Sequence, residues 1–154
     1  MSAIEQAYSK WCEQQFPRPS EQDILDLEHR INARFSDHYR DYLLDWNGGM
    51  FRWPTIFHPT ESHSVGEVLY LNGIHASVDF AELGRALDLS LFEDNDPPIV
   101  LPIGTTTAND LIMLSMVIGD EADGMVILRT IDQENIHLGD TMDEFFALLR
   151  DREV

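Results

Sequence analysis

The sequence of 154 residues has few positive charges. Lys10 is its only lysine, and 10 Lys and Arg residues face 28 Asp and Glu residues, which gives a formal net charge of -18. Such a charge repels the phosphates of nucleic acids and the anionic surface of a membrane. We therefore expect neither as a partner, and the charge favours a basic protein instead.

Cysteine and long apolar runs are also scarce. Cys12 is the only cysteine, so the sequence predicts no disulfide framework. The first residues lack the basic and apolar regions of a signal peptide. The longest apolar run, LIMLSMVIG at 111–119, is too short to cross a bilayer. We expect a cytoplasmic protein, and the length together with 44% hydrophobic residues predicts one folded domain over 1–154.

Motifs typical of enzymes and cofactor sites are missing. Of the six histidines only His58 and His63 lie close together, in a proline-containing loop without the spacing of a zinc site. Cys12 falls in a helical pattern with no thiolate-stabilising cluster beside it. Residues 104–110 contain one glycine and no lysine, unlike a phosphate-binding loop. We expect no catalytic residue, metal or cofactor, although chance carboxylate pairs leave glycosidase-like or other small-molecule chemistry open as a weaker alternative.

The acidic residues are concentrated in the second part of the chain. Residues 1–52 carry 9 acids and 6 bases, whereas residues 53–154 carry 19 acids and 4 bases. Two acidic runs fall in expected loops, and their candidate partner-binding residues are Glu93, Asp94, Asp96, Asp120, Glu121 and Asp123. Neither run has the ligand spacing of an EF-hand. Two interpretations stay open: solvated turns that discourage aggregation, or a docking rim for arginine and lysine of a partner.

Aromatic residues cluster in the middle of the sequence, at Trp46, Phe51, Trp53 and Phe57. Packing in the core is the expected role for most of them. Any that remains exposed would serve as an anchor in an interface, because large rigid aromatics contribute most to protein binding. Trp53 is our candidate for that role.

Hydrophobic periodicity predicts three helices in the first third. Apolar spacing from Ile4 to Trp11 indicates the first. Ser20 with Asp23 has the pattern of a capping box and begins the second. Ser36 begins the third, which runs to Trp46 and ends at the Asn-Gly-Gly of 47–49.

The rest of the chain predicts a sheet and a final helix. Sequential antiparallel strands are expected from three apolar runs, Ile99–Ile103, Leu111–Ile118 and Met125–Ile131, which turn-forming segments separate. Further elements are expected as an edge strand over Met50–His58, a strand over Glu67–Ile74, and helices over Asp79–Leu91 and Thr141–Leu149. The predicted class is α+β, with N-terminal helices packed on a mostly antiparallel sheet and a C-terminal helix.

Several segments resemble known motifs. HYRDYLLDWNGGMF (38–51) resembles the Tyr-x-x-[Phe/Tyr]-Leu-x-x-x-Asn-Gly-Gly element of the SUKH superfamily, which groups fungal cell-wall assembly regulators with bacterial toxin-immunity proteins. The segments at 24–31, 102–116, 124–132 and 141–149 resemble its other motifs in the same order, so the resemblance covers about 20–150. The sequence departs from the family at Phe35-Ser36, where Leu-Pro is usual, and at a turn usually rich in glycine, which here is TTTAND.

The resemblance implies a non-enzymatic protein-binding domain. In bacteria such a domain is commonly an immunity protein that binds and neutralises a cognate toxin, often a nuclease with a basic cleft. The alternative is a regulatory or scaffolding module without a toxin partner. No cofactor is implied, and the oligomeric state is left open.

Overall fold

The computed structural model describes residues 2–31, 33–84, 100–116 and 124–152. The helices are α1 (Ala3–Trp11), α2 (Glu21–Ile31), α3 (Asp37–Asp45) and α5 (Met142–Ala147), with a short 3-10 helix η1 (Asp79–Ala81). The strands are β1 (Cys12–Gln15), β2 (Gly49–Phe51), β3 (Thr55–Phe57), β4 (Ser64–Leu71), β5 (Val100–Thr106), β6 (Leu111–Ser115), β7 (Val126–Arg129), β8 (Asn135–Gly139) and β9 (Leu149–Arg150).

The strands form one sheet in which every described pairing between strands is antiparallel. Its order is β1-β2-β4-β5-β6-β7-β8, and β3 pairs with β4 on one side and with β9 on the other. The strands from β5 to β8 follow one another as neighbours, and the three apolar runs predict the first three of them. The predicted α+β class with a mostly antiparallel sheet is therefore confirmed.

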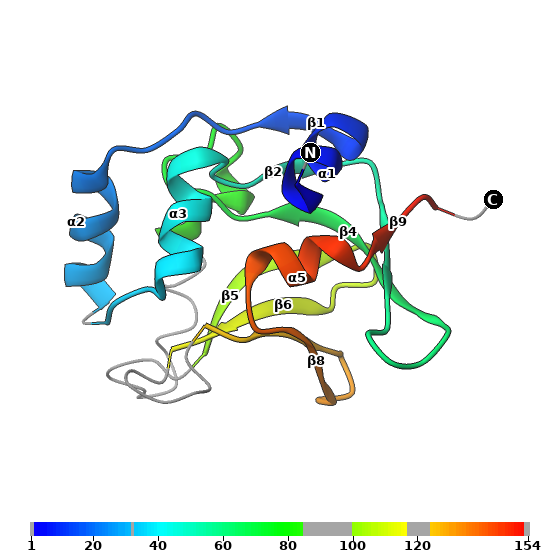
Figure 1. The fold of residues 1–154 in the computed structure, drawn as a ribbon. Helices are drawn as coiled ribbons and strands as arrows, with labels where there is room; N and C mark the ends of the chain where they lie inside the picture. The colour runs from blue at the N-terminus through cyan, green and yellow to red at the C-terminus, as the bar shows by residue number, and fades with distance from the viewer. Residues whose placement is uncertain (1, 32, 85–99, 117–123, 153–154) are drawn as a thin grey trace.

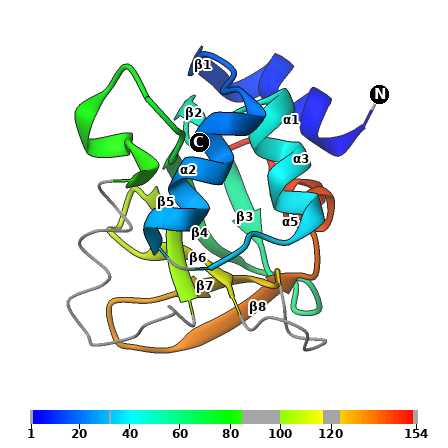
Figure 2. The ribbon, with the colours of Figure 1, turned by 90° about the vertical axis from the view of Figure 1, so that its left-hand side faces the viewer.

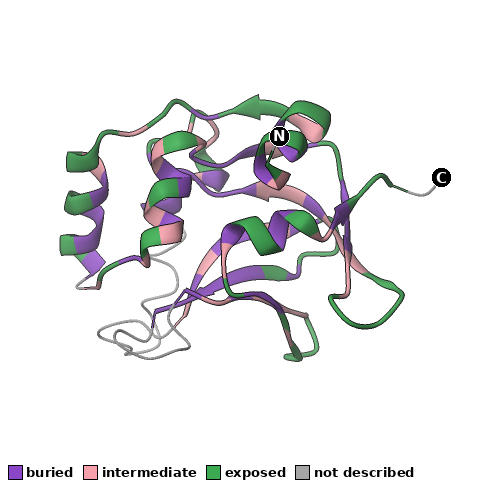
Figure 3. Cartoon of the chain, in the orientation of Figure 1, coloured by how far each residue is buried: buried purple, intermediate pink, exposed green. Residues whose placement is uncertain are grey.

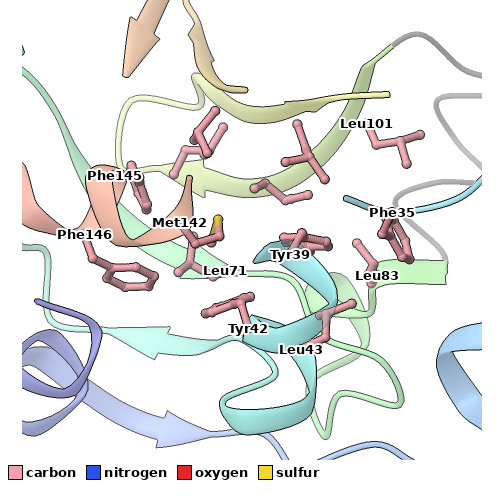
Figure 4. Packing of buried hydrophobic residues seen from close by; sticks show 14 of the residues in the cluster. Phe35, Tyr39, Tyr42, Leu43, Leu71, Leu83, Leu101, Met142, Phe145 and Phe146 are labelled. Carbon is pink, nitrogen blue, oxygen red and sulfur yellow. The ribbon is translucent and has the colours of Figure 1, made fainter. Parts of the chain in front are cut away.

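Helices α1, α3 and α5 lie along one side of the sheet, and α2 stands next to α3 (Figures 1 and 2). Figure 3 shows buried residues on one side of α2, α3 and α5 and exposed residues on the other. The core fills the space between helices and sheet, where Tyr42 from α3 contacts Phe146 from α5 with ring centroids 5.8 Å apart, and Tyr39 and Phe145 belong to the same cluster (Figure 4). Burial of these large apolar surfaces holds the helices against the strands.

Helix α2 begins at the predicted capping box. The backbone N–H of Asp23 donates to the Ser20 hydroxyl at 3.1 Å, and the Ser20 N–H donates to the Asp23 carboxylate at 2.9 Å. These two bonds satisfy N–H groups that no helical partner can reach. The bond from the Ser20 backbone also holds the pKa of the Asp23 carboxyl below its ordinary value.

Helix α3 begins after Ser36 as predicted, but the serine hydroxyl forms no capping bond. Its oxygen is buried without a partner in the described structure. The turn before α3 is instead held by the buried Glu28 of α2. The Glu28 carboxylate accepts the Phe35 N–H at 2.7 Å and lies 3.6 Å from the Arg40 guanidinium. The sequence therefore predicts the start of this helix correctly and the bond responsible for it wrongly.

Several short elements differ from the predictions. Cys12 was expected in a helix, but α1 ends at Trp11 and Cys12 begins β1. The expected single strand over Met50–His58 is two strands, β2 and β3. The helix expected over Asp79–Leu91 begins later than predicted, because η1 is followed by an extended Glu82. Leu83 and Gly84 are helical, and residues 85–91 lie outside the described residues. Strands β1, β8 and β9 were not predicted.

Asn47 joins three parts of the chain where α3 ends. Its side-chain amide donates to the carbonyls of Pro17 (2.6 Å) and Ile74 (2.9 Å), and its oxygen accepts the Ile74 N–H at 2.8 Å. Asn47 itself is fully buried and has a φ of 57°, in the left-handed region. Next to it, Gly48 has a φ of 74°, and a Cβ there would lie 2.5 Å from the Leu71 carbonyl oxygen. The predicted Asn-Gly-Gly stop is thus also the point where the helices are fixed to the sheet.

We expect Asn47→Ala to lower the free energy of unfolding by about 3 kcal/mol or more, because buried backbone groups lose their partners and alanine disfavours a positive φ. Asn47→Gly removes the same bonds but tolerates the backbone conformation, so its loss should be about 1 kcal/mol smaller. Urea unfolding of both variants measures the difference. Equal stability of Asn47→Ala and the natural sequence would show that these bonds carry no net stability.

Candidate functional site

Helices α1, α3 and α5 enclose a groove of about 480 Å³, which we call the helix groove. It is lined by Ser2, Ile4, Glu5, Arg18, His38, Asp41, Tyr42, Asp45, Trp46, Met142 and Asp143. Its apolar floor comes from all three helices and includes the buried Ile4, Tyr42 and Met142. The groove therefore exists only because residues from both ends of the chain pack together.

Negative charge surrounds this apolar floor. The exposed acids Glu5, Asp41, Asp45 and Asp143 line the groove together with a single basic residue, Arg18. None of these four acids forms an ion pair with another residue of the described structure. Uncompensated charge on the rim of an apolar groove favours a cationic occupant with an aliphatic stem, which arginine and lysine provide.

His38 fixes one wall of the helix groove. Its Nδ1 accepts the Met142 N–H at 3.1 Å, and its Nε2 lies 2.7 Å from the Gly124 carbonyl oxygen. A carbonyl only accepts, so Nε2 carries the proton and the ring is neutral in this arrangement. Gly124 has a φ of 82°, and a Cβ there would lie 2.6 Å from Nε2. His38 thus connects α3 to the start of α5 and to the chain that enters β7.

Trp53 lies in the connection between β2 and β3 and is 43% exposed. Its φ of 55° is in the left-handed region, which is unfavourable for a bulky side chain. The guanidinium of Arg152 stacks over its ring at 5.3 Å. Glu67 holds that guanidinium through an ion pair of 2.9 Å. The structure therefore places Trp53 at the surface in a restrained position, as an interface anchor requires.

The other aromatics of the cluster differ in how deeply they are buried. Phe51 is buried, and the half-buried Trp46 stacks on Tyr8 with ring centroids 4.6 Å apart. Phe57 is also half-buried. Phe51 belongs to the core and Trp46 packs against it, as expected of them, whereas Phe57 lines a surface groove and Trp53 is left exposed.

The six acids proposed from the loop sequences, Glu93, Asp94, Asp96, Asp120, Glu121 and Asp123, lie outside the described residues. The acids that the structure does bring together were missed by sequence reasoning. Glu5 and Asp143 are far apart in the sequence, and no local pattern relates them to Asp41 and Asp45. The only local signal was the spacing of Asp41 and Asp45, which places both on one face of α3.

The surroundings of Cys12 and of the neighbouring histidines His58 and His63 are those of residues with a structural role. Desolvation by burial raises the pKa of the Cys12 thiol to about 11. His58 Nδ1 accepts the N–H groups of Thr60 and Glu61 and so shapes the turn after β3. The described residues contain no group of three or more His, Cys, Asp or Glu side chains placed to hold a metal ion.

The helix groove and the exposed tryptophan are features of a domain that acts by contact with another protein. The chain belongs to the SMI1 / KNR4 family (SUKH-1), whose family model matches residues 18–148. Membership confirms the resemblance to the SUKH superfamily and the protein-interaction class that it implies. No curated protein matches the sequence closely enough to count as a relative. Among the described helices, none has the length and apolar character needed to cross a membrane.

We expect His38→Ala to lower the free energy of unfolding by about 2 kcal/mol, because two hydrogen bonds to backbone groups are lost. The matched control is His137→Ala, since His137 is exposed and bonds only to the nearby Asp140. That variant should change stability by less than about 0.5 kcal/mol. Urea unfolding compares the two, and equal effects would contradict the role of His38 as a connector.

The raised pKa of Cys12 makes a prediction about its reactivity. At pH 8 the thiolate population should be about a hundredfold smaller than that of a thiol with an ordinary pKa of 9, because thiolate increases tenfold per pH unit below the pKa. The alkylation rate of the folded protein with iodoacetamide, followed by mass spectrometry, should rise steadily from pH 8 to pH 10. A rate that levels off near pH 9 would contradict this assignment.

Proposed function

We propose that this protein is a non-enzymatic immunity protein that binds and neutralises a cognate bacterial toxin with a basic surface, such as a nuclease. The observation that carries the proposal is the helix groove, where four unpaired carboxylates surround an apolar floor. Arginine and lysine side chains of the toxin would enter this groove, their stems against the half-buried Trp46 and their charges at the rim.

The charge of the whole chain supports the same partner. A net charge of -18 attracts a basic protein over a long range and accelerates the encounter. A nuclease must present positive charge to bind phosphates, so an acidic inhibitor can occupy the same cleft. The charge also supports the view that neither nucleic acid nor a membrane is the partner. Neutralisation would take place in the cytoplasm, where such a toxin meets its target.

The absence of an enzymatic role is part of the proposal and has physical support. The Cys12 thiol is a poor nucleophile at neutral pH because burial raises its pKa. Both nitrogens of His38, the histidine in the helix groove, are engaged with backbone groups. A histidine held in this way has no free nitrogen to act as a general base.

The second candidate function is a regulatory or scaffolding module without a toxin partner. The observation that favours it is the exposed Trp53, which lies outside the residues that line the helix groove. A module that joins two proteins needs two separate surfaces, whereas an inhibitor needs one. The experiments below separate these functions.

Co-expression with a toxin encoded next to this protein should restore growth. Combined Asp41→Lys and Asp45→Lys should abolish protection and slow association by about tenfold or more, because the variant repels the cation that the groove attracts. Its association rate should also depend less on salt concentration. Growth assays and surface plasmon resonance with the purified pair measure these effects.

The matched control is Glu134→Lys together with Asp132→Lys, which makes the same charge change in the exposed turn between β7 and β8. These substitutions should leave protection intact and change the association rate by less than about threefold. If both pairs of substitutions act equally, net charge explains the binding and the helix groove does not. Failure to bind or protect against any neighbouring gene product would favour the scaffolding function.

A further inference from the structure

We propose that the side of the sheet that faces away from the helices is a surface for self-association, and that its occupant is a second copy of this chain. We call this surface the outer stripe and define it by Tyr70, Phe80, Thr105, Leu111, Arg129 and Ile131. It shares no residue with the helix groove. The proposal therefore goes beyond the proposed function and stands independently of it.

The pairing of the strands places most of the outer stripe in one row. Tyr70 in β4 lies opposite Thr105 in β5. Thr105 in turn lies opposite Leu111 in β6, which lies opposite Arg129 in β7. Residues that face one another across antiparallel strands lie on the same side of a sheet. The row therefore crosses four neighbouring strands, over a distance of about 14 Å from Tyr70 to Arg129.

The next row shows which side of the sheet the outer stripe occupies. Ile112 and Leu128, the neighbours of Leu111 and Arg129 along their strands, pair with each other and are fully buried in the core. Successive side chains of a strand point to opposite sides of the sheet. Leu111 and Arg129 therefore point away from the core and from helices α1, α3 and α5, which lie along the other side (Figures 1 and 2).

Exposed apolar side chains gather along the outer stripe. Five large hydrophobic residues of the described chain are exposed, and three of them are Phe80 (56%), Leu111 (38%) and Ile131 (68%). The ring of Phe80 contacts that of Tyr70, with centroids 5.2 Å apart. The Ile131 N–H donates to the Asp110 carboxylate at 3.0 Å, which holds Ile131 beside Leu111. A group of exposed apolar side chains is a feature of a protein interface.

The outer stripe contains no acid, although the sequence has 28 acids. Its one charged residue is Arg129, whose Nε donates to the side-chain oxygen of Asn135 at 3.1 Å. None of the ion pairs between described residues includes this guanidinium. Two copies with a net charge of -18 each repel one another, but contact through this row brings no carboxylate of the row against another.

The order of side chains along the outer stripe selects a second copy as the occupant. The rings of Tyr70 and Phe80 stand at one end and the guanidinium of Arg129 at the other, with Thr105 and Leu111 between them. A two-fold axis parallel to the strands, between β5 and β6, places the aromatic end of each copy over Arg129 of the other. Each guanidinium then meets aromatic rings, whose faces attract cations. The outer stripe is therefore complementary to itself, as a two-fold symmetric interface requires.

Face-to-face packing of two sheets suits this arrangement. Packed sheets lie about 10 Å apart with their strands within about 30° of each other, and interdigitating side chains fill the space between them. Phe80, Leu111 and Ile131 of both copies supply that layer. A basic toxin finds no carboxylate in the outer stripe, and both helix grooves of such a dimer remain open on its outer sides.

Sedimentation velocity of the full-length protein measures the association. In about 0.15 M NaCl, charges more than about 8 Å apart are largely screened, so the net charge should not prevent contact. The protein should sediment as a monomer at about 1 µM and mainly as a dimer at about 100 µM, as expected for a small interface.

Phe80→Ala and Arg129→Gln should each weaken dimerisation by about tenfold, because each substitution removes both symmetric contacts between rings and guanidinium. The matched control is Leu25→Ala, because Leu25 is another exposed apolar residue, at 48%, and lies in α2 on the helix side of the molecule. It should change the dissociation constant of the dimer by less than about twofold.

Mixing the two variants tests the two-fold arrangement itself. A dimer of Phe80→Ala alone or of Arg129→Gln alone keeps neither contact between Phe80 and Arg129. A mixed dimer keeps one, because the copy with Arg129→Gln retains Phe80 and the copy with Phe80→Ala retains Arg129. The mixed dimer should therefore be about threefold tighter than either variant dimer, after the statistical advantage of mixing is removed. Fluorescence-detected sedimentation with one variant labelled measures this.

The proposal is overturned if the natural sequence remains monomeric up to about 1 mM, if both variants dimerise as tightly as the natural sequence, or if the mixed dimer is no tighter than the variant dimers. The variant with Asp41→Lys and Asp45→Lys must still dimerise, and Phe80→Ala must still protect against the toxin. Loss of protection in the first variant tests the helix groove alone, and loss of the dimer in the second tests the outer stripe alone.

Discussion

The bonds of the Asn47 side chain are the constraint on which the rest of the structure depends. They tie the connection before α2, the end of α3 and the chain after β4 to one buried amide. Gly48 allows the backbone to turn against β4 immediately afterwards. Because α3 is fixed here relative to the sheet, its outer face lies beside α1 and α5 and can form the wall of the helix groove. A buried amide has few alternative partners, so this junction is specific as well as stabilising.

Local signals explain which parts of the fold could be predicted from the sequence. The capping box at Ser20, the length of α3 and the successive strands β5, β6 and β7 depend on residues close to one another in the chain. Strands β1, β8 and β9 are short and polar or irregular in pattern, and distant partners decide their conformation. The unpaired hydroxyl of Ser36 was equally unpredictable, because the distant carboxylate of Glu28 holds the turn instead.

The same distinction applies to the candidate site. Trp53 could be selected from the sequence because any exposed aromatic in a dense cluster is a good anchor, but its stacking on Arg152 could not. The rim of the helix groove combines residues from α1, α3 and α5, and only the tertiary structure brings Glu5 and Asp143 together. Composition revealed the excess of negative charge, whereas packing decides where that charge is opposed and where it is left uncompensated.

The pairing of β3 with β9 has a consequence for synthesis of the protein on the ribosome. Thr55 pairs with Arg150, so a segment made early waits until residue 150 has emerged before its second neighbour arrives. Strands β5 to β8 form from consecutive segments and close only short loops, so they can assemble first. The helix groove also needs Met142 and Asp143, which places its completion among the last events. A product that stops before residue 142 would lack both the helix groove and the second neighbour of β3.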